Sequence, residues 1–317
     1  MLGVIGDVVQ DVVVWQLEQV RHATDTKSEV RMQRGGSAAN VAAFAAPRYP
    51  TRFIGCIGDD LGGVVLTKEL ERHGVDVRMQ VRDVTGMIVV LIDQEGERLM
   101  FPSRGASARL ETIDPAWFDG LELLHVTAYS FESGSSTAAA VLEAVREAKR
   151  RGIKVSLDVS STGMIDHFGI PAFLALMDQC QLDFISANRD ESLYLGLADG
   201  HDPGPNLARF GEVVLLARQG KDSTNIFKAG RFVAAVPVTP VEEVRDLTGA
   251  GDAFNAGFLT SYLAGDGDLV ANCLAGHALS ARVLACPGAS EPSPATTDEA
   301  SRRSQSPEGL SSKQTRG

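Results

Sequence analysis

Residues 246–254 read Asp-Leu-Thr-Gly-Ala-Gly-Asp-Ala-Phe, and an apolar stretch with helical spacing follows them. The small residues at 249–251 let the backbone approach a ligand closely. They leave several N–H groups pointing outward at a predicted helix start, which suits a phosphate or a developing negative charge. Asp252 adds a carboxylate at the edge of this turn, near enough to accept a proton from an attacking hydroxyl. The alternative is that Asp252 or Thr248 caps the helix and that the glycines serve only the turn.

Outward from this turn, short apolar runs rich in β-branched residues alternate with Ala-rich helical stretches. The expected strands are Leu2–Ile5, Arg52–Ile57, Met87–Ile92, Leu123–Val126, Lys154–Asp158, Phe184–Ser186 and Val213–Ala217. The expected helices are Ser37–Ala46, Val64–His73, Ser136–Arg151, Ile170–Gln179, Ala253–Ala264 and Leu269–Leu284. This alternation predicts βαβ units, a mainly parallel sheet and therefore an α/β fold. Ligands bind such sheets at the carboxyl ends of the strands.

Two segments break this alternation, and the end of the chain lacks apolar residues. Asp11–Gln33 and Gln80–Phe101 carry strand patterns with little helical pattern between them. They predict a small accessory sheet that projects from the main domain. Residues 290–317 are rich in Ser, Pro, Thr and Glu, so we expect them to be disordered.

Composition limits the class of protein and its partners. The chain has 317 residues, 44% of them apolar and 22% charged, which is typical of a soluble globular enzyme or binding protein. The formal charge of −11 disfavours nucleic acid and anionic membranes as partners. No apolar run approaches the roughly 20 residues of a membrane span, and the start does not resemble a signal peptide. The four cysteines form no CxxC pair, so we expect reduced thiols and a cytoplasmic protein that acts on a small molecule.

A second glycine motif, Arg-Gly-Gly-Ser-Ala-Ala-Asn at residues 34–40, opens an Ala-rich helix. A polyhydroxylated ligand could lie against the backbone of Gly35 and Gly36 and form hydrogen bonds to Asn40. The alternative is close packing of the helix on the sheet, with no ligand. Asn40 favours the ligand-binding alternative, because Asn is a mediocre helix former and it stands where such a ligand would lie.

Two acidic stretches complete the candidate set. Asp11 follows the predicted strand Leu2–Ile5 and is expected at its carboxyl end, where carboxylates bind sugar hydroxyls; a plain loop acid is the alternative. Asn188 and Glu191 place an amide and a carboxylate three residues apart, which suits a hydrated magnesium that carries phosphates. A helix capping box is the alternative for this pair.

Two common nucleotide-binding signatures are missing from the sequence. Gly220-Lys221 is followed by Asp222 rather than Ser or Thr, so it is not a Walker A loop. The stretch from Gly249 to Phe254 imitates GxGxxG but ends in Phe, and it lies far from the first βαβ unit. An NAD-dependent dehydrogenase is therefore a remote alternative.

Together, in this order and at these separations, RGGSAAN near residue 35 and DLTGAGDAF near residue 250 resemble the ribokinase-like (PfkB) family of carbohydrate kinases. The resemblance runs from about Leu2 to Ala289. It implies a three-layer α/β/α sandwich with a β-sheet lid, and a kinase domain at 1–289 whose lid comes from about 11–33 and 80–101. It also implies transfer of the ATP γ-phosphoryl group to a hydroxyl, with Mg²⁺ and, in many members, K⁺. The lid often forms a dimer contact, so a homodimer through the lid is expected.

The resemblance also assigns roles to individual residues. Asp252 matches the catalytic base, and Gly249, Ala250 and Gly251 match the anion hole. The sugar-binding positions match Asp11, Gly35, Gly36 and Asn40. The nucleotide and magnesium positions match Asn188, Glu191, Gly220, Thr248 and His277. Backbone carbonyls for K⁺ would come from Asp246, Thr248, Val283, Cys286 and Gly288.

The sequence is compatible with more than one class of phosphoryl acceptor. Arg98 and Arg104 could contact an acidic sugar, although surface solvation is the more common explanation for an arginine. Trp15, Phe101 and Phe131 could instead stack on a nucleoside base, as in an adenosine kinase, or form a small core within the accessory sheet. A family member that binds its ligand without transferring phosphate is a further alternative.

Overall fold

The structure is a computed structural model that describes residues 1–132, 134–265 and 268–292. Most of the predicted tail, residues 293–317, lies outside the described residues. Within them, the strands form a large sheet, a four-stranded second sheet and a small hairpin.

The large sheet has nine strands in this part of the chain, in the order β15-β14-β13-β10-β9-β8-β1-β4-β5. Their bounds are β1 Leu2–Ile5, β4 Thr51–Ile57, β5 Asp76–Val81, β8 Leu123–Thr127, β9 Lys154–Asp158, β10 Phe184–Asn188, β13 Val214–Arg218, β14 Ser223–Lys228 and β15 Arg231–Pro237. The strands from β5 to β13 are parallel, and β14 and β15 add an antiparallel edge. The predicted mainly parallel sheet is confirmed.

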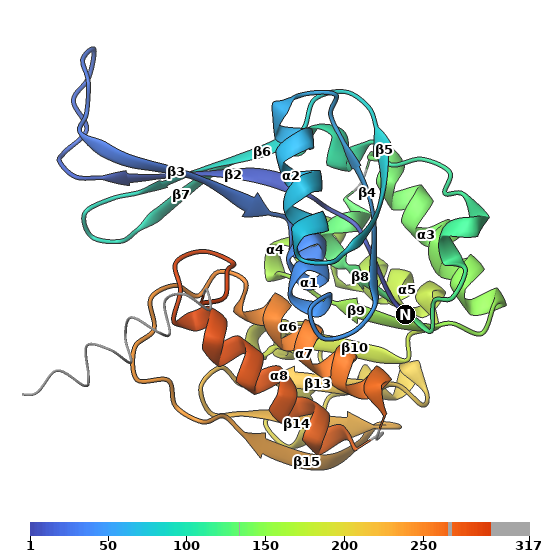
Figure 1. Ribbon diagram of the computed structural model, residues 1–317. Coiled ribbons are helices and arrows are strands. Elements are labelled where there is room, and N and C mark those ends of the chain that lie inside the picture. Colours follow the sequence, from blue (N-terminus) through green and yellow to red (C-terminus); the bar gives the residue numbers. More distant parts are fainter. Residues whose placement is uncertain (133, 266–267, 293–317) are drawn as a thin grey trace, which may run out of the picture.

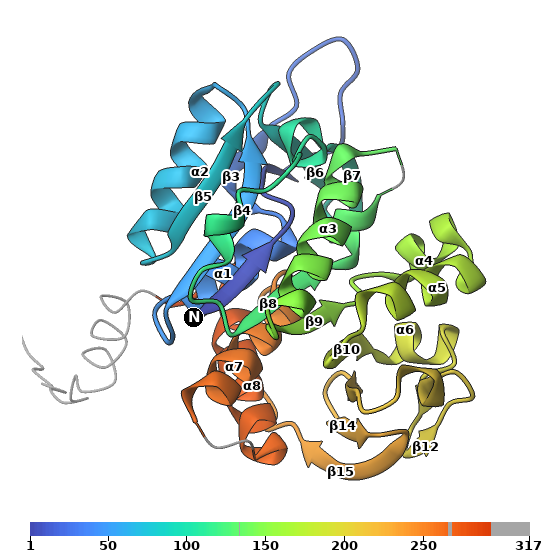
Figure 2. The same cartoon turned by 90° about the vertical axis from the view of Figure 1, so that its right-hand side faces the viewer.

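Helices cover both faces of this sheet and make three layers (Figure 2). One face packs against α1 (Ser37–Ala45), α2 (Leu61–Arg72), α7 (Ala250–Ala264) and α8 (Leu269–Leu284). The other packs against α3 (Ser136–Arg150), α4 (Thr162–Phe168) and α5 (Ile170–Cys180), and the short α6 (Arg189–Tyr194) follows β10. The 3₁₀ turns are Gly105–Ala108, Pro115–Phe118, Ala128–Phe131 and Leu207–Phe210, and β11 (Ala198–Asp199) pairs with β12 (Asp202–Pro203).

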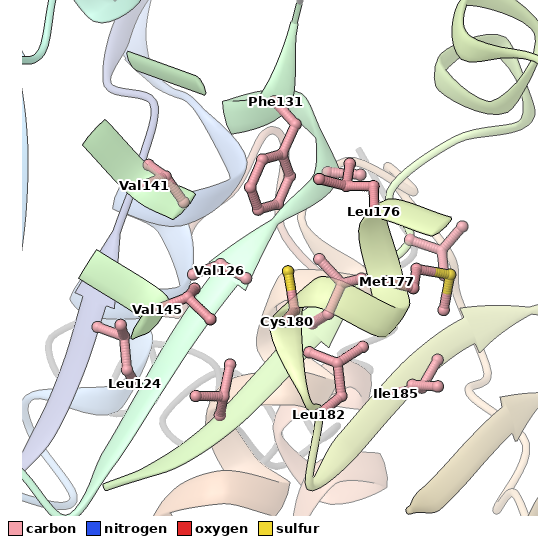
Figure 3. Packing of buried hydrophobic residues seen from close by; sticks show 14 of the residues in the cluster. Leu124, Val126, Phe131, Val141, Val145, Leu176, Met177, Cys180, Leu182 and Ile185 are labelled. Carbon is pink, nitrogen blue, oxygen red and sulfur yellow. The ribbon is translucent and has the colours of Figure 1, made fainter. Parts of the chain in front are cut away.

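The core on the α3 and α5 side shows why the strands read as continuous apolar runs. Val141 and Val145 of α3 pack over Leu124 and Val126 of β8, all of them at most 1% exposed (Figure 3). A parallel strand that is buried on both faces has no solvent side for polar residues, so its sequence does not alternate.

The second sheet is the lid. It has the order β3-β2-β6-β7, with bounds β2 Val9–Gln16, β3 Ser28–Gly35, β6 Gly86–Ile92 and β7 Arg98–Ser103. Its two central strands, β2 and β6, are parallel, and the outer pairs are antiparallel. Figure 1 shows the lid projecting to one side of the main domain.

Several expected boundaries differ from the structure, among them the start of α2, which lies at Leu61 rather than Val64. Gln80 belongs to β5 of the main sheet, so the second lid segment begins at Gly86, and the first extends from Val9 to Gly35. Helix α7 begins at Ala250 rather than Ala253, because Gly249 adopts the left-handed conformation (φ 79°) from which the helix starts. The apolar pattern alone could not locate this start, since the first helical residues are small.

Candidate active site

Asp252 lies in the first turn of α7, where both of its carboxylate oxygens face helix α1. Oδ1 accepts a hydrogen bond from Ser37 Oγ at 2.6 Å, and Oδ2 accepts one from Asn40 Nδ2 at 2.9 Å. Burial raises the pKa of Asp252 to about 7, against the opposing effect of these two hydrogen bonds. A carboxylate that is oriented by two donors and titrates near neutrality is suited to accept a proton.

Asn40 is in turn held from the lid side. Its Oδ1 accepts from Arg34 Nε at 3.1 Å, which fixes the amide so that its NH₂ points at Asp252. Arg34 is only 4% exposed and also donates to Glu69 at 2.6 Å and to the carbonyl of Ala289 at 3.0 Å. The Asn40 amide therefore links Arg34 of β3 to Asp252 of α7, and its contact with a ligand stays a prediction.

Asp7 follows the carboxyl end of β1 and was not among the residues selected from the sequence. Its carboxylate accepts the backbone N–H groups of Ser37 and Ala38, each at 3.1 Å, and so caps the start of α1. Gly36 adopts φ 93° beside it, and a Cβ there would lie 2.6 Å from the Asp7 carbonyl oxygen. Gly36 is therefore required by the packing, and the ligand contact expected at the double glycine stays a prediction.

Asp11 was expected at the carboxyl end of the first strand, but it is the third residue of lid strand β2. The chain crosses from β1 into the lid within four residues, a crossing that the apolar pattern did not reveal. Asp11 Oδ1 is buried and has no hydrogen-bond partner in the described structure, and a Cβ on Gly35 would lie 2.1 Å from it. Burial raises the pKa of Asp11 to about 7, and the neighbouring Asp7 adds to this shift. An unpartnered carboxylate of this kind suits a ligand hydroxyl.

A cleft of about 650 Å³ lies on the other side of the first turn of α7. Ala250 and Gly251 line it, together with the predicted nucleotide residues Asn188, Gly220 and His277. The His277 ring is 5.5 Å from Phe254, its Nε2 bonds to Thr224 Oγ1 at 2.8 Å, and burial lowers its pKa. The turn at 249–251 therefore separates this cleft from Asp252 and α1.

Asn188 and Glu191 form the capping box that was the alternative reading of this motif. Asn188 Oδ1 accepts the N–H of Glu191, and the Glu191 carboxylate accepts both the backbone N–H and the Nδ2 of Asn188. Glu191 is 1% exposed, whereas Asn188 is exposed at the cleft. Burial and the neighbouring Asp158 raise the pKa of Glu191 to about 7.

The residues expected to hold K⁺ are largely engaged with one another. Asp246 accepts from Thr248 N at 2.9 Å, from Gly288 N at 3.0 Å and from Arg98 of the lid at 2.8 Å. The Val283 carbonyl accepts the N–H of Cys286 at 2.9 Å. Thr248, which was also expected to contact the nucleotide, donates its hydroxyl hydrogen to Asp246. Its neighbour Leu247 is among the described residues that line the cleft, whereas Thr248 is not.

The residues considered for contact with the acceptor lie in different parts of the structure. Phe131 is 2% exposed within the main core, and Phe101 is on the opposite face of the lid from Asp11. Trp15 shares the face of Asp11 but packs beside Val13 and against Arg31. Arg104 is not a solvated surface residue: it lies over the Tyr129 ring and 3.7 Å from the Asp7 carboxylate.

Sequence reasoning also missed two charged residues at the carboxyl ends of the two strands that flank β10. Asp158 ends β9 and Arg218 ends β13, and the Asp158 carboxylate is 3.3 Å from the Arg218 guanidinium. Their position at strand ends was a usable signal. A larger open depression of about 940 Å³, lined by Phe184 at the start of β10 and by Val213, lies at the opposite ends of the strands.

Comparison with known proteins decides the family. The family model for the pfkB family carbohydrate kinases matches residues 1–296. The chain belongs to the PfkB family of carbohydrate kinases. It is an ATP-dependent phosphotransferase that acts on a hydroxyl group of a sugar or nucleoside.

Among its relatives, the kinase is 30% identical over 256 residues to an ATP-dependent ribose-1-phosphate kinase of Halopiger xanaduensis, with 77% of this chain and 79% of the relative covered. It is 32% identical over 284 residues to a fructokinase of Klebsiella pneumoniae, with 83% and 84% covered. A putative ribokinase II from E. coli, solved in complex with ATP and Mg²⁺, has a TM-score of 0.77 at 23% identity, covering 91% of this chain and 94% of that one.

Proposed function

We propose that this kinase transfers the γ-phosphoryl group of ATP to a hydroxyl of a small sugar or sugar derivative. The observation that carries the proposal is the placement of Asp252, which bonds to Ser37 and Asn40 of α1 on one side of a glycine turn whose other side lines a cleft. The acceptor would occupy the α1 and lid side, and the nucleotide would occupy the cleft.

In the proposed reaction, Asp252 orients the acceptor hydroxyl and takes its proton. The acceptor oxygen forms a bond to the γ-phosphorus while the bond from that phosphorus to the bridging oxygen breaks, and ADP leaves. The N–H groups at 249–251, at the start of α7, offer their partial positive charge to the moving phosphoryl group. Asp11 would accept a hydrogen bond from another acceptor hydroxyl.

Magnesium fits the donor set, because the available groups are carboxylate and amide oxygens. The described residues contain no cluster of three or more His, Cys, Asp or Glu side chains that could hold a metal by itself, which suits an ion that arrives with the nucleotide. Asn188, backed by Glu191, would hold its water shell. When bound, the ion would neutralise part of the negative charge of the phosphates.

Potassium fits less well. Of the backbone carbonyls expected to hold it, that of Val283 already accepts the N–H of Cys286, and that of Gly288 accepts the N–H of Ser290.

We favour a sugar over a nucleoside because the acceptor side offers no aromatic platform for a base among the three candidates. Phe131 is buried in the core, Phe101 faces away from Asp11, and Trp15 is four residues further out along β2. The hydrogen-bonding groups that do face this side, Asp11, Ser37 and Asn40, suit hydroxyls.

We also propose a homodimer through the lid. The face of the lid opposite Asp11 carries two rows of apolar side chains that lie side by side in the strand register: Met32, Val12, Val89 and Phe101, then Val30, Val14, Leu91 and Leu99. Met32 is 68% exposed and Leu99 is 57% exposed. A contiguous apolar sheet face of this kind indicates an interface, and a second copy offers a matching one.

For location and other partners we propose a cytoplasmic enzyme that binds neither nucleic acid nor membranes. Its cysteines are all free thiols, and its net charge of −11 opposes binding to phosphate backbones and anionic lipids. No helix in the described part of the chain could span a membrane.

The test is ADP release from ATP with ribose, fructose, ribose 1-phosphate, keto-deoxygluconate and adenosine as acceptors, with and without K⁺. We expect saturable turnover with at least one sugar. Turnover of adenosine alone would favour the nucleoside kinase, and no ADP with any acceptor would favour a ligand-binding protein without transfer.

A further inference from the structure

Arg218 is the one arginine among the described residues that lines the cleft, and nothing above gives it a role. It ends strand β13, pairs in register with Asn188 of β10, and its side chain is 16% exposed. Its guanidinium lies over the Phe254 ring, 5.9 Å from the centroid. The residue is therefore fixed at the carboxyl edge of the sheet, beside the start of α7.

Most of the hydrogen-bonding capacity of Arg218 is unused. A guanidinium has five N–H donors, and the bond to Asp158 Oδ2, at 3.3 Å from Nη2, is long. The Nε is buried and has no partner in the described structure. A buried donor without a partner is costly unless a ligand supplies the acceptor.

Asp158 does not depend on Arg218 for its own hydrogen bonds. Its carboxylate also accepts the N–H of Ser160, at 2.6 Å, and the side-chain amide of Asn255. The ion pair therefore positions the guanidinium more than it satisfies the carboxylate.

Gly251 shows where the guanidinium is directed. A Cβ built on Gly251 would lie 2.3 Å from Arg218 Nη1, so the guanidinium lies directly against the backbone of the turn that starts α7. Any larger residue at 251 would displace it. Two sources of positive potential, the helix start and the guanidinium, thus meet at one point of the cleft wall, and an anion is the ligand that both favour.

We propose that Arg218 binds the terminal phosphates of the nucleotide and stabilises the phosphoryl group during transfer. This inference rests on the proposed placement of ATP in the cleft. Arg218 approaches from the sheet, while the N–H groups at 249–251 approach from the helix, so the two surround the phosphoryl group from different sides. Arg offers a planar fork that matches two phosphate oxygens, which Lys cannot reproduce.

The test uses Arg218→Ala and Arg218→Lys in the full chain, with Arg231→Ala on the exposed strand β15 as a matched control. Binding of ATP, ADP and adenosine is measured by calorimetry without acceptor, and kcat and both KM values are measured with the best acceptor. We expect Arg218→Ala to weaken ATP binding roughly 10- to 100-fold and to leave adenosine binding unchanged. Its kcat should fall roughly 10²- to 10³-fold, with the acceptor KM unchanged.

Two further results separate phosphate binding from a structural role. Added guanidinium ion should restore part of the kcat of Arg218→Ala. In Arg218→Lys, the ATP affinity should fall by a smaller factor than kcat does.

Equal loss of ATP and adenosine binding in Arg218→Ala would overturn the proposal. So would ATP binding and a kcat that match those of Arg231→Ala. If Arg218→Ala does not fold, a wild-type kcat in Arg218→Lys overturns it. A wild-type chain that phosphorylates no acceptor would defeat the proposed function alone, because the calorimetry needs no acceptor.

Discussion

The Nδ2 of Asn40 donates to Oδ2 of Asp252 across 2.9 Å, and this bond joins the two glycine motifs that lie more than 200 residues apart in the sequence. Arg34 continues the chain of contacts by bonding to Asn40 Oδ1 at 3.1 Å. The orientation of the proposed base is therefore set by the segment that connects the lid to the main domain.

Replacing Asp252 by Asn should abolish turnover without unfolding the protein. Loss of a well-placed base costs about 10²- to 10⁴-fold in rate. In the wild type, the raised pKa of about 7 means that kcat/KM should fall below that pH, as Asp252 becomes protonated. Steady-state kinetics from pH 5 to 9 check both points. A variant with near wild-type kcat, or a flat profile, contradicts the assignment.

The same substitution should stabilise the fold at alkaline pH. Because the folded state raises the pKa of Asp252 from 3.8 to about 7, it binds the proton more tightly than the unfolded chain does. Stability from this group is complete below pH 3.8 and is lost as the pH rises through 7. Asp252→Asn should therefore gain roughly 1–2 kcal/mol in unfolding free energy at pH 8. The gain should shrink toward pH 5, and a gain that grows on acidification would contradict the sign.

Asp11→Asn should affect the acceptor and spare the nucleotide. Oδ1 is buried without a protein partner, so we expect its contribution to appear only when a ligand hydroxyl donates to it. The acceptor KM should rise roughly 10- to 100-fold, and the KM for ATP should stay at the wild-type value. Equal changes in both KM values would place Asp11 outside the acceptor site.

Arg98→Ala should loosen the lid. Arg98 of β7 reaches Asp246 at 2.8 Å and Thr248 at 3.3 Å, which connects the lid to the loop before α7. The Arg98 side chain is 43% exposed, so its loss should cost at most about 1 kcal/mol of stability. A lid that closes less firmly admits water as a competing acceptor. Phosphate release from ATP without acceptor should rise several-fold relative to transfer, and an unchanged ratio would show that this contact does not hold the lid.

Met32→Glu combined with Phe101→Glu should convert the dimer to a monomer. Both side chains belong to one row of the apolar lid face, and two carboxylates there would be buried without partners in the interface. Sedimentation velocity measures the change, with Arg31→Ala on the opposite face as control. A wild-type protein that sediments as a monomer at micromolar concentration would remove the proposed interface.

Periodicity predicted most of the fold because the strands are buried on both faces and their helices carry one apolar stripe. It failed at Asp11 and at the start of α7, where the deciding residues are small or polar and the direction of the chain depends on distant contacts. Asn40 and Asp252 could be selected from motifs, but their mutual hydrogen bond required the packing of α1 on α7. Phe131 was misassigned because an aromatic residue after a strand has no local signal that separates core from site.

The parallel pairing of β2 with β6 has a consequence for assembly. A parallel pair cannot be closed by a short turn, and here the connection between β2 and β6 includes β4 and β5 of the main sheet. The lid therefore cannot form as an independent hairpin ahead of the domain that carries it. Its centre should be among the last parts to gain protection from hydrogen exchange during refolding, so an intermediate that already binds nucleotide would still lack its acceptor site.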